Sequence, residues 1–341
     1  MEFFSTVWNR ENSPYANNRI PGMIVTARGT LILYNEAREK GGDWAHMDIF
    51  MQRSEDFGRT FGEPIYLARG NDRFKTVNNP VMAEDKNGVL HFLHCEDYSI
   101  RGGRVLHRTS TDDGITWSDP QDITCMTLPL YRNAFALGPG HGICTADGTL
   151  VFPIWMVPKC YEQEITSHIP SCISTLYSRD CGVSWQIGEI LIGNDEAVSP
   201  SETTVTPTSD GRIYLNARVN KHHCRAVSYS QNGYRGWSPL TLDRSLTDPC
   251  CFGSSVTVEL DGKSAILFAN CDAENERKNV TVRVSLDDGK TFTHRKVIDP
   301  DRGGYVEIAA DQRNGLIYVL YEENWGKSCH LRVMDFASLL S

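Results

Sequence analysis

The stretch Ser54-Glu55-Asp56-Phe57-Gly58-Arg59-Thr60-Phe61 returns three more times along this chain of 341 residues. The further copies are Ser110–Trp117, Ser178–Trp185 and Ser285–Phe292, and Ser230–Trp237 is a fifth copy that has lost the aspartate. In such a stretch the Ser and Asp side chains can bond backbone amides of the loop that they begin, and Gly supplies a positive φ. The aromatic residue then returns between the layers as the next strand starts. The pattern therefore predicts a recurring hairpin turn.

The spacing of these turns indicates the architecture. Their serines lie 52 to 68 residues apart, and short strand-like runs, such as residues 48–53, 89–93 and 280–284, alternate with Asp-Gly or Asn-Gly turns. Helical periodicity is almost absent. A period of about 50 to 60 residues with four strands per unit is typical of a β-propeller, whereas a β-helix or a two-domain sandwich does not account for turns spaced this widely. We therefore predict an all-β, six-bladed propeller that spans residues 1–341 as one domain, with one blade closed by the first and last strands together.

The composition excludes several classes of protein. Hydrophobic residues make up 40% and aromatic residues 10% of the chain, which is enough to bury a core and excludes disorder. The 34 basic and 43 acidic residues give a net charge of −9, so we expect neither a nucleic-acid partner nor an anionic membrane partner. Residues 1–18 contain acids and amides where a signal peptide needs an apolar core, and no apolar run is long enough to span a membrane. We expect a cytoplasmic location.

Cysteine and histidine spacing gives no metal signature. The eleven cysteines include no CxxC pair, and the adjacent Cys250 and Cys251 are poorly placed to pair with each other, so we expect reduced, mostly packed thiols. The run His222-His223-Cys224 has no further ligand at zinc-like spacing, and a turn is the preferred interpretation. Motifs of the GxGxxG, P-loop, HExxH and GxSxG types are absent from the sequence.

The repeated turns resemble the Asp boxes of the sialidase (neuraminidase) superfamily, where they lie on the rim away from the catalytic face. Asp boxes also occur in propellers without glycosidase activity, so they indicate only a scaffold. A second set of fragments follows the order of sialidase motifs along nearly the whole chain. These fragments are Arg19-Ile20-Pro21, Glu36-Ala37-Arg38 with Asp43, Gly138–Ile143, Ser201–Val205, Asn216–Arg218, Glu276–Val282, Gly304-Tyr305 and Leu320–Glu322. Together they resemble an exo-α-sialidase domain.

The resemblance implies a clamp of three arginines, Arg19, Arg218 and Arg277. A sialic acid carries a carboxylate on its anomeric carbon, beside the bond that is cut. Guanidinium groups suit that carboxylate because Arg is always ionised and its planar fork can bond both oxygens. Three buried cations repel one another in an empty pocket, so at least one needs a counter-charge. By resemblance, Glu322 supports Arg19.

Three further residues are implied to carry the chemistry. A carboxylate nucleophile would be repelled by the substrate carboxylate, and sialidases use a tyrosine instead, which by resemblance is Tyr305. A phenol with a pKa of about 10 needs a base as it attacks, and Glu202 fits that role. Asp43 is the expected acid for the departing oxygen and later activates water, with Asp48 as the competing candidate. Such an enzyme needs neither metal nor organic cofactor.

Other positions bear on the identity of the sugar. Arg38 is expected to contact polar groups of the substrate. Val306-Glu307-Ile308 stands where sialidases usually have a serine, and Asn78-Asn79-Pro80 stands where an aspartate often precedes proline. Trp44, Trp155 and Met156 are candidates for an apolar wall against an N-acetyl group, or equally for core packing.

Two functions from different classes remain open from the sequence. The first is an exo-α-sialidase that releases sialic acid, or a related ulosonic acid such as Kdn, with retention through a tyrosyl-glycoside. The second is a sialic-acid-binding propeller that keeps the arginine clamp but has lost turnover. The presence of Asp43, Glu202 and Tyr305 together favours the enzyme, because binding alone needs only the clamp. A trans-glycosylase would differ mainly in acceptor access, and another acidic sugar is a further alternative substrate.

Overall fold

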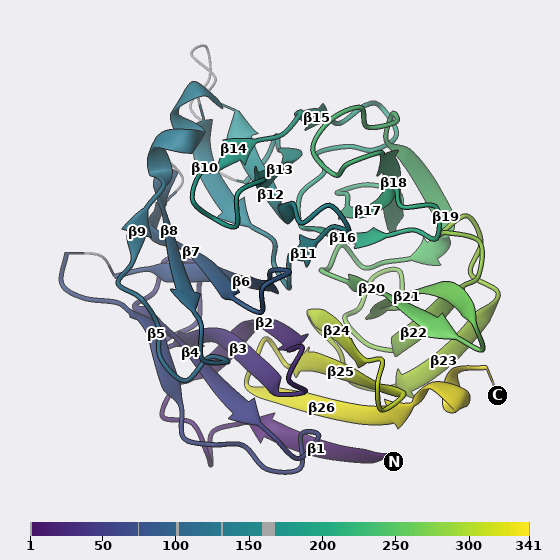
Figure 1. The fold of residues 1–341 in the computed structure, drawn as a ribbon, viewed down its shortest axis with the longest axis horizontal. Coiled ribbons are helices and arrows are strands. Elements are labelled where there is room, and N and C mark those ends of the chain that lie inside the picture. Colours follow the sequence, from purple (N-terminus) through teal and green to yellow (C-terminus); the bar gives the residue numbers. More distant parts are fainter. Residues whose placement is uncertain (1, 74, 100–101, 131, 159–167, 341) are drawn as a thin grey trace.

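The computed structural model describes residues 2–73, 75–99, 102–130, 132–158 and 168–340. These residues form six antiparallel sheets arranged as blades around a central axis (Figure 1). The first blade holds β2 (Asn17–Val25), β3 (Leu31–Arg38), β4 (Met47–Ser54) and β5 (Ile65–Arg69). The second holds β6 (Val77–Glu84), β7 (Leu90–Ser99), β8 (Gly102–Ser110) and β9 (Gln121–Asp122). The third holds β10 (Arg132–Leu137), β12 (Leu150–Pro158), β13 (Cys172–Ser178) and β14 (Gln186–Ile187), with β11 (Ile143–Cys144) and β15 (Leu191–Ile192) added beside β12 and β13.

The remaining three blades repeat the same order of strands. The fourth holds β16 (Thr203–Pro207), β17 (Ile213–Arg218), β18 (Cys224–Ser230) and β19 (Thr241–Thr247). The fifth holds β20 (Ser254–Leu260), β21 (Lys263–Cys271), β22 (Val280–Ser285) and β23 (His294–Asp299). The sixth holds β24 (Val306–Asp311), β25 (Leu316–Glu323), β26 (Ser328–Asp335) and β1 (Phe3–Trp8). The described helices are two short 3₁₀ segments, η1 (Thr124–Leu130) and η2 (Phe336–Leu339), and none of them is long and apolar enough to cross a membrane.

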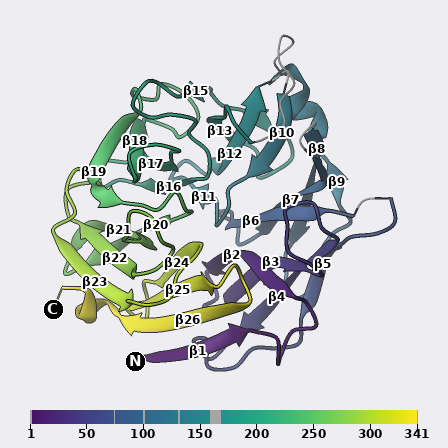
Figure 2. The ribbon, with the colours of Figure 1, turned by 180° about the vertical axis from the view of Figure 1, so that it is seen from behind.

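The sixth blade is built from both ends of the chain. β1 pairs antiparallel with β26, with Phe3 opposite Val333, and forms the outer strand of that blade. Figure 2 shows the two ends side by side at this blade. The predicted six-bladed propeller and its closure by the first and last strands are therefore confirmed.

Each of the four intact repeats forms the same turn at the end of the third strand of its blade. In the first copy, Ser54 is the last residue of β4, and its Oγ accepts a hydrogen bond from the amide of Gly58 at 2.8 Å. Asp56 Oδ1 accepts from the amide of Thr60 at 2.9 Å, and Gly58 has a φ of +85°. In the decayed copy, Gly233 stands one position closer to Ser230 and bonds its Oγ at 3.1 Å.

The topology separates these turns from the opposite face of the propeller. Because neighbouring strands are antiparallel, the turns after the first and third strands lie at one end of each blade, and the loops after the second strand lie at the other. All four intact repeats follow a third strand. The fragments that contain the predicted site residues lie at the starts of first strands and at or just after the ends of second strands, on the face away from the repeats. The fragment Gly138–Ile143 instead runs from the end of β10 to the start of β11.

Polar contacts join several blades close to the axis. Tyr34 on β3 donates its hydroxyl to the carbonyl of Gly140 at 2.8 Å and accepts from the amide of Met82 on β6 at 3.1 Å. Glu307 on β24 is fully buried and pairs with His141 Nδ1 at 2.5 Å. These hydrogen bonds link the first, second, third and sixth blades to one another near the axis.

The cysteines and the histidine pair are placed as follows. The ten described cysteines are all free, six of them buried, and Cys160 lies outside the described residues. His222 and His223 adopt positive φ values of 72° and 50° in the turn between β17 and β18, as the sequence predicted. Over the residues that the structure describes, no group of three or more His, Cys, Asp or Glu could hold a metal ion.

Candidate active site

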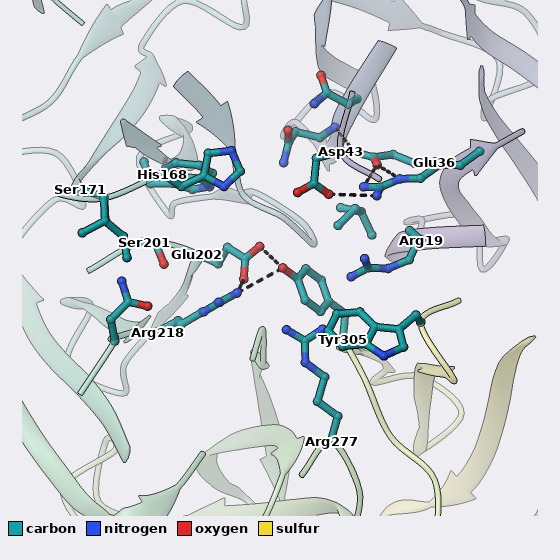
Figure 3. Close-up of a pocket in the computed structure, with 18 residues that line it drawn as sticks. Arg19, Glu36, Asp43, His168, Ser171, Ser201, Glu202, Arg218, Arg277 and Tyr305 are labelled. Atoms are coloured by element: carbon teal, nitrogen blue, oxygen red, sulfur yellow. Dashed lines mark hydrogen bonds and ion pairs between the residues drawn. The ribbon is translucent and has the colours of Figure 1, made fainter. Parts of the chain in front are cut away.

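A cavity of about 380 Å³ opens on the axis, on the face away from the repeated turns. Seven of the eight predicted site residues line it: Arg19, Arg38, Asp43, Glu202, Arg218, Arg277 and Tyr305. The eighth, Glu322, lies beneath it and is fully buried. These eight residues come from four blades, the first, fourth, fifth and sixth. Figure 3 shows six of them around the cavity: Arg19, Asp43, Glu202, Arg218, Arg277 and Tyr305.

Local backbone features turn these side chains toward the cavity. β2 carries a bulge between Arg19 and Gly22, and β6 carries one between Asn78 and Val81. A bulge re-aims the side chains of the strand that carries it. Gly304, before Tyr305, has a packing role, because a Cβ there would lie 2.6 Å from the Cβ of Glu322. The glycine thus lets the start of β24 approach the end of β25.

Tyr305, Glu202 and Arg218 form the centre of the site. The Tyr305 hydroxyl donates to Glu202 Oε1, and Arg218 Nη1 donates to Glu202 Oε2 at 2.7 Å and to the Tyr305 oxygen at 3.3 Å. Burial raises the pKa of Tyr305 well above its ordinary value, Glu202 raises it further, and the nearby arginines offset only part of this. The phenol is therefore neutral and already bonded to the one group able to take its proton.

The three predicted arginines surround that phenol. The guanidinium carbons of Arg19 and Arg277 lie 5.1 and 5.3 Å from the centre of the Tyr305 ring, and Arg218 bonds its oxygen. These residues come from the first, fifth and fourth blades. Figure 3 shows Arg218, Arg277 and Arg19 placed around Tyr305. The arrangement concentrates positive charge on one side of the cavity.

The arginines differ in whether a carboxylate compensates their charge. Glu322 Oε1 accepts from Arg19 Nε at 3.0 Å and from the amide of Ile20 at 2.9 Å. Burial lowers the pKa of Arg19, but the charge and hydrogen bond of Glu322, together with the charges of Tyr305 and Glu36, outweigh burial, so that pKa is raised. Arg277 has no carboxylate partner among the described residues, and its Nη1 is buried without a hydrogen-bond acceptor. An anion in the cavity would supply that acceptor.

Asp43 is held by Arg38 on another side of the cavity. Arg38 Nη1 donates to Asp43 Oδ1 at 2.9 Å, and its Nη2 donates to Glu36 Oε2 at 2.6 Å. Burial raises the pKa of Asp43, but the charge and hydrogen bond of Arg38 outweigh burial and hold that pKa below its ordinary value. The Asp43 side chain is about half exposed, so substrate can reach it. The competing Asp48 accepts hydrogen bonds from Tyr15 and the amide of Gly70 and does not line the cavity.

The wall across from Arg19 contains groups that the sequence did not reveal. Figure 3 shows His168 and Ser171 on this side, and neither belongs to a recognisable motif. The His168 ring packs 5.4 Å from that of Trp155, and burial lowers the pKa of His168. Asn78 Oδ1, Trp155 Nε1 and Ser171 Oγ are buried and have no hydrogen-bond partner among the described residues. Asn78 Oδ1 is an acceptor, Trp155 Nε1 is a donor and Ser171 Oγ can be either. Each of these three residues is at most 6% exposed.

The three candidates for an apolar wall lie in different surroundings. Trp155 lines the cavity. Met156 is wrong as a wall residue, because its side chain is 1% exposed and packs in the core of the second and third blades. Trp44 is half exposed and contacts the His168 ring at 5.6 Å without lining the cavity. Strand alternation explains the first two outcomes, since neighbouring residues of β12 point to opposite faces.

Trp325 is a further lining residue that sequence reasoning missed. Its ring centre lies 4.5 Å from the guanidinium carbon of Arg277 and 5.6 Å from that of Arg19. The signal in the sequence is the run Asn324-Trp325-Gly326, which places an aromatic residue between two turn residues, directly after Glu322 and Glu323. Such a position exposes the ring at the tip of a hairpin.

Comparisons with known proteins agree with this geometry. Residues 62–319 match the family described as BNR repeat-like domain. The chain belongs to the sialidase (BNR-repeat) superfamily. It is similar to the sialidase of Micromonospora viridifaciens, with 30% identity over 91% of this chain and 50% of that protein. The sialidase of Bacteroides fragilis is 28% identical over 91% of this chain and 57% of that protein. This superfamily member thus spans about half the length of these two relatives.

Solved sialidase structures share its fold. The Hadza microbial sialidase Hz136 has a TM-score of 0.83 at 25% identity and covers 96% of this chain and 67% of its own. The intramolecular trans-sialidase of Ruminococcus gnavus has a TM-score of 0.80 at 17% identity, over 99% of this chain and 98% of its own. The second likeness concerns the fold alone.

Proposed function

We propose that this chain is an exo-α-sialidase that hydrolyses terminal α-linked sialic acid with retention of configuration. One observation carries the proposal. Guanidinium groups from three blades surround a buried phenol that is hydrogen-bonded to a carboxylate. The clamp fits a substrate whose carboxylate adjoins the reacting carbon, and the phenol fits the nucleophile that such a substrate requires. The sialidase relatives support this activity.

In the first step the substrate carboxylate binds Arg19, Arg218 and Arg277. It fills the place next to Arg277 Nη1, which has no acceptor among the described residues. The anomeric carbon then lies over the Tyr305 oxygen. Tyr305 attacks while Glu202 takes its proton, and the carbon–oxygen bond to the leaving group breaks. Arg218 bonds both Glu202 and Tyr305, so it can follow the charge as it moves between them.

Asp43 gives its proton to the departing oxygen and later takes one from the attacking water. As the water oxygen bonds to the anomeric carbon, the bond from that carbon to the Tyr305 oxygen breaks, and Glu202 returns its proton to the phenol. For that role its pKa must rise, whereas Arg38 holds it low in the ligand-free site. Substrate that covers Asp43 increases its burial, which raises the pKa of a carboxyl. Hydroxyl groups of the sugar that bind Arg38 would also compete for the hydrogen bond that Asp43 now accepts. Both changes raise the pKa of Asp43, as its role as an acid requires.

The wall of Asn78, Trp155 and Ser171 favours an N-acyl substituent at C5. With the carboxylate in the clamp and C2 over Tyr305, the far side of the ring faces this wall. An amide offers an N–H to Asn78 Oδ1 and a carbonyl to Trp155 Nε1. The C5 hydroxyl of Kdn can also donate and accept, but both functions lie on a single oxygen atom, and Kdn has no acyl group to pack against Trp155. The apolar face of Trp155 suits the acyl methyl group. We therefore expect N-acetylneuraminic acid glycosides to be cut faster than Kdn glycosides.

The test is release of a fluorophore from sialosides and Kdn glycosides by the wild-type protein and two variants. Tyr305→Phe should lower kcat by more than about 100-fold, since it removes the nucleophile, while sialic acid still binds. Tyr321→Phe is a matched control, because its buried hydroxyl also bonds a carboxylate, Asp299 Oδ2 at 2.8 Å, but outside the cavity. Binding of sialic acid without any release by the wild-type protein would instead indicate a binding propeller.

A further inference from the structure

A second cavity of about 350 Å³ opens directly beside the first. It shares Arg19, Arg38, Asp43 and Trp325 with the first cavity and adds Asn17, Gly41 and Gly42. We call it the side groove. Its volume falls within the range of small-molecule sites, about 300–1,000 Å³. Because Asp43 lies where the two cavities meet, the side groove begins at the residue that the proposed reaction uses to protonate the leaving group.

The turn that carries Trp325 is strained and fixed. Asn324, Trp325 and Gly326 have φ values of +50°, +60° and +78°. Positive φ is costly for a bulky residue, so a Trp held there needs a reason beyond folding. Asn17 Nδ2 donates to the carbonyl of Trp325 at 3.0 Å, and the amide of Asn18 donates to the carbonyl of Gly326 at 2.6 Å. The backbone therefore presents the indole at one place.

The indole is 61% exposed at that place. Exposed large aromatic side chains beside a concave site commonly mark a binding surface. Trp325 already contacts the guanidinium groups of Arg19 and Arg277, but these contacts leave most of the ring open to solvent. An occupant of the side groove would cover the remaining surface.

The charges of the side groove are compensated. Arg19 pairs with Glu322, and Arg38 pairs with both Glu36 and Asp43. The remaining polar side chain, Asn17, is neutral and can both donate and accept. An aromatic face beside an amide suits a neutral sugar ring, because its C–H bonds carry partial positive charge that is attracted to the negative face of the indole. Among the described residues that line this groove, each arginine already has a carboxylate partner, whereas the clamp includes Arg277, whose Nη1 has no acceptor.

We propose that the side groove binds the leaving-group sugar of the substrate, a neutral pyranose, and that Trp325 is its stacking platform. This inference rests on the proposed function, since it needs a sialoside whose leaving oxygen lies at Asp43. Trp325 then determines which leaving groups the enzyme prefers. The three arginines of the clamp determine recognition of the sialic acid itself.

The experiment compares two substrates, sialyllactose and methyl α-sialoside. Both release an alcohol that needs a proton, but only sialyllactose places a sugar ring in the side groove. Trp325→Asn removes the indole and keeps a residue type that adopts positive φ, so the turn is retained. Because Trp325 also contacts Arg19 and Arg277, the variant can lower kcat/KM for both substrates, but the loss should be about five- to tenfold larger for sialyllactose than for methyl α-sialoside, as expected for loss of one aromatic contact with the released sugar.

Trp44→Ala is the matched control. Trp44 is 50% exposed and lies next to Gly42 and Asp43, but it lines neither cavity. Its removal should leave the ratio of the two rates unchanged. An equal loss on both substrates in Trp325→Asn would overturn the groove proposal, because Trp325 would then act only through Arg19 and Arg277. No loss on sialyllactose would also overturn it. If the wild-type protein cuts neither substrate, the proposed function fails, and the groove proposal falls with it.

Discussion

Replacement of Glu322 by glutamine should destabilise the ligand-free protein strongly. Glu322 is fully buried and is the carboxylate that pairs with Arg19, at 3.0 Å. Glutamine keeps the shape and one acceptor oxygen, but it removes the negative charge. Arg19 is 8% exposed, so its charge would stay out of water without compensation. Removing one partner of a buried ion pair costs about 3–5 kcal/mol.

The free energy of unfolding should therefore fall by about 3–5 kcal/mol in Glu322→Gln, measured by urea unfolding at neutral pH. A bound carboxylate can replace the missing negative charge near Arg19. Added sialic acid should accordingly raise the stability of the variant by more than it raises that of the wild-type protein.

The neighbouring Glu323 provides the control. It lies on the same strand but points outward, where it pairs with His330 at 2.8 Å and with Arg302 at 3.3 Å, and its side chain is 35% exposed. Glutamine keeps a hydrogen-bond acceptor for the buried His330, and the pair with the partly exposed Arg302 is a surface ion pair worth about 0–1 kcal/mol, so Glu323→Gln should change stability by about that amount. Equal losses for the two variants would refute the argument that the clamp depends on a buried counter-charge.

Three further predictions concern pH, specificity and the turns. Burial lowers the pKa of His94 to about 3, so the folded protein keeps this imidazole neutral, while the unfolded chain takes up a proton below about pH 6.5. The free energy of unfolding should therefore fall between pH 7 and pH 5. In His94→Gln this fall, measured by urea unfolding, should be smaller by about 2 kcal/mol. Trp155→Phe should lower kcat/KM for N-acetylneuraminic acid glycosides about five- to tenfold relative to kcat/KM for Kdn glycosides. Trp185→Phe is the control, because it removes an indole N–H that is also buried and unpartnered but lies elsewhere, and it should leave the ratio of these two kcat/KM values unchanged. Asp287→Ala removes the acceptor of the Thr291 amide at 2.9 Å and should cost about 1–2 kcal/mol of stability with kcat unchanged, because the turn lies on the face away from the site; a lower kcat would argue against that separation.

The fold could be predicted because its signals are local and repeated. Ser54 and Asp56 bond amides within six residues of themselves, so the turn is encoded where it forms. Spacing then gives the number of blades. The predicted site residues could also be placed, because each stands in a short motif at a strand end and the propeller brings those ends together.

Other parts of the site are not visible in the sequence, because they depend on contacts between blades. His168 and Ser171 stand in no motif, and they line the cavity from the segment directly before β13. Trp155 and Met156 are equally apolar, and only the orientation of β12 decides which one faces substrate. The role of Trp325 depends on its φ and on Asn17, which is about 300 residues away in the chain.

The closure of the ring by β1 and β26 also has a consequence for biosynthesis. Phe3 pairs with Val333, so the sixth blade, which carries Tyr305, Glu322 and Trp325, cannot be completed until β26 has been synthesised. Until Glu322 has been synthesised, Arg19 lacks its counter-charge. The cavity therefore takes its final form only after the last of the six blades has closed.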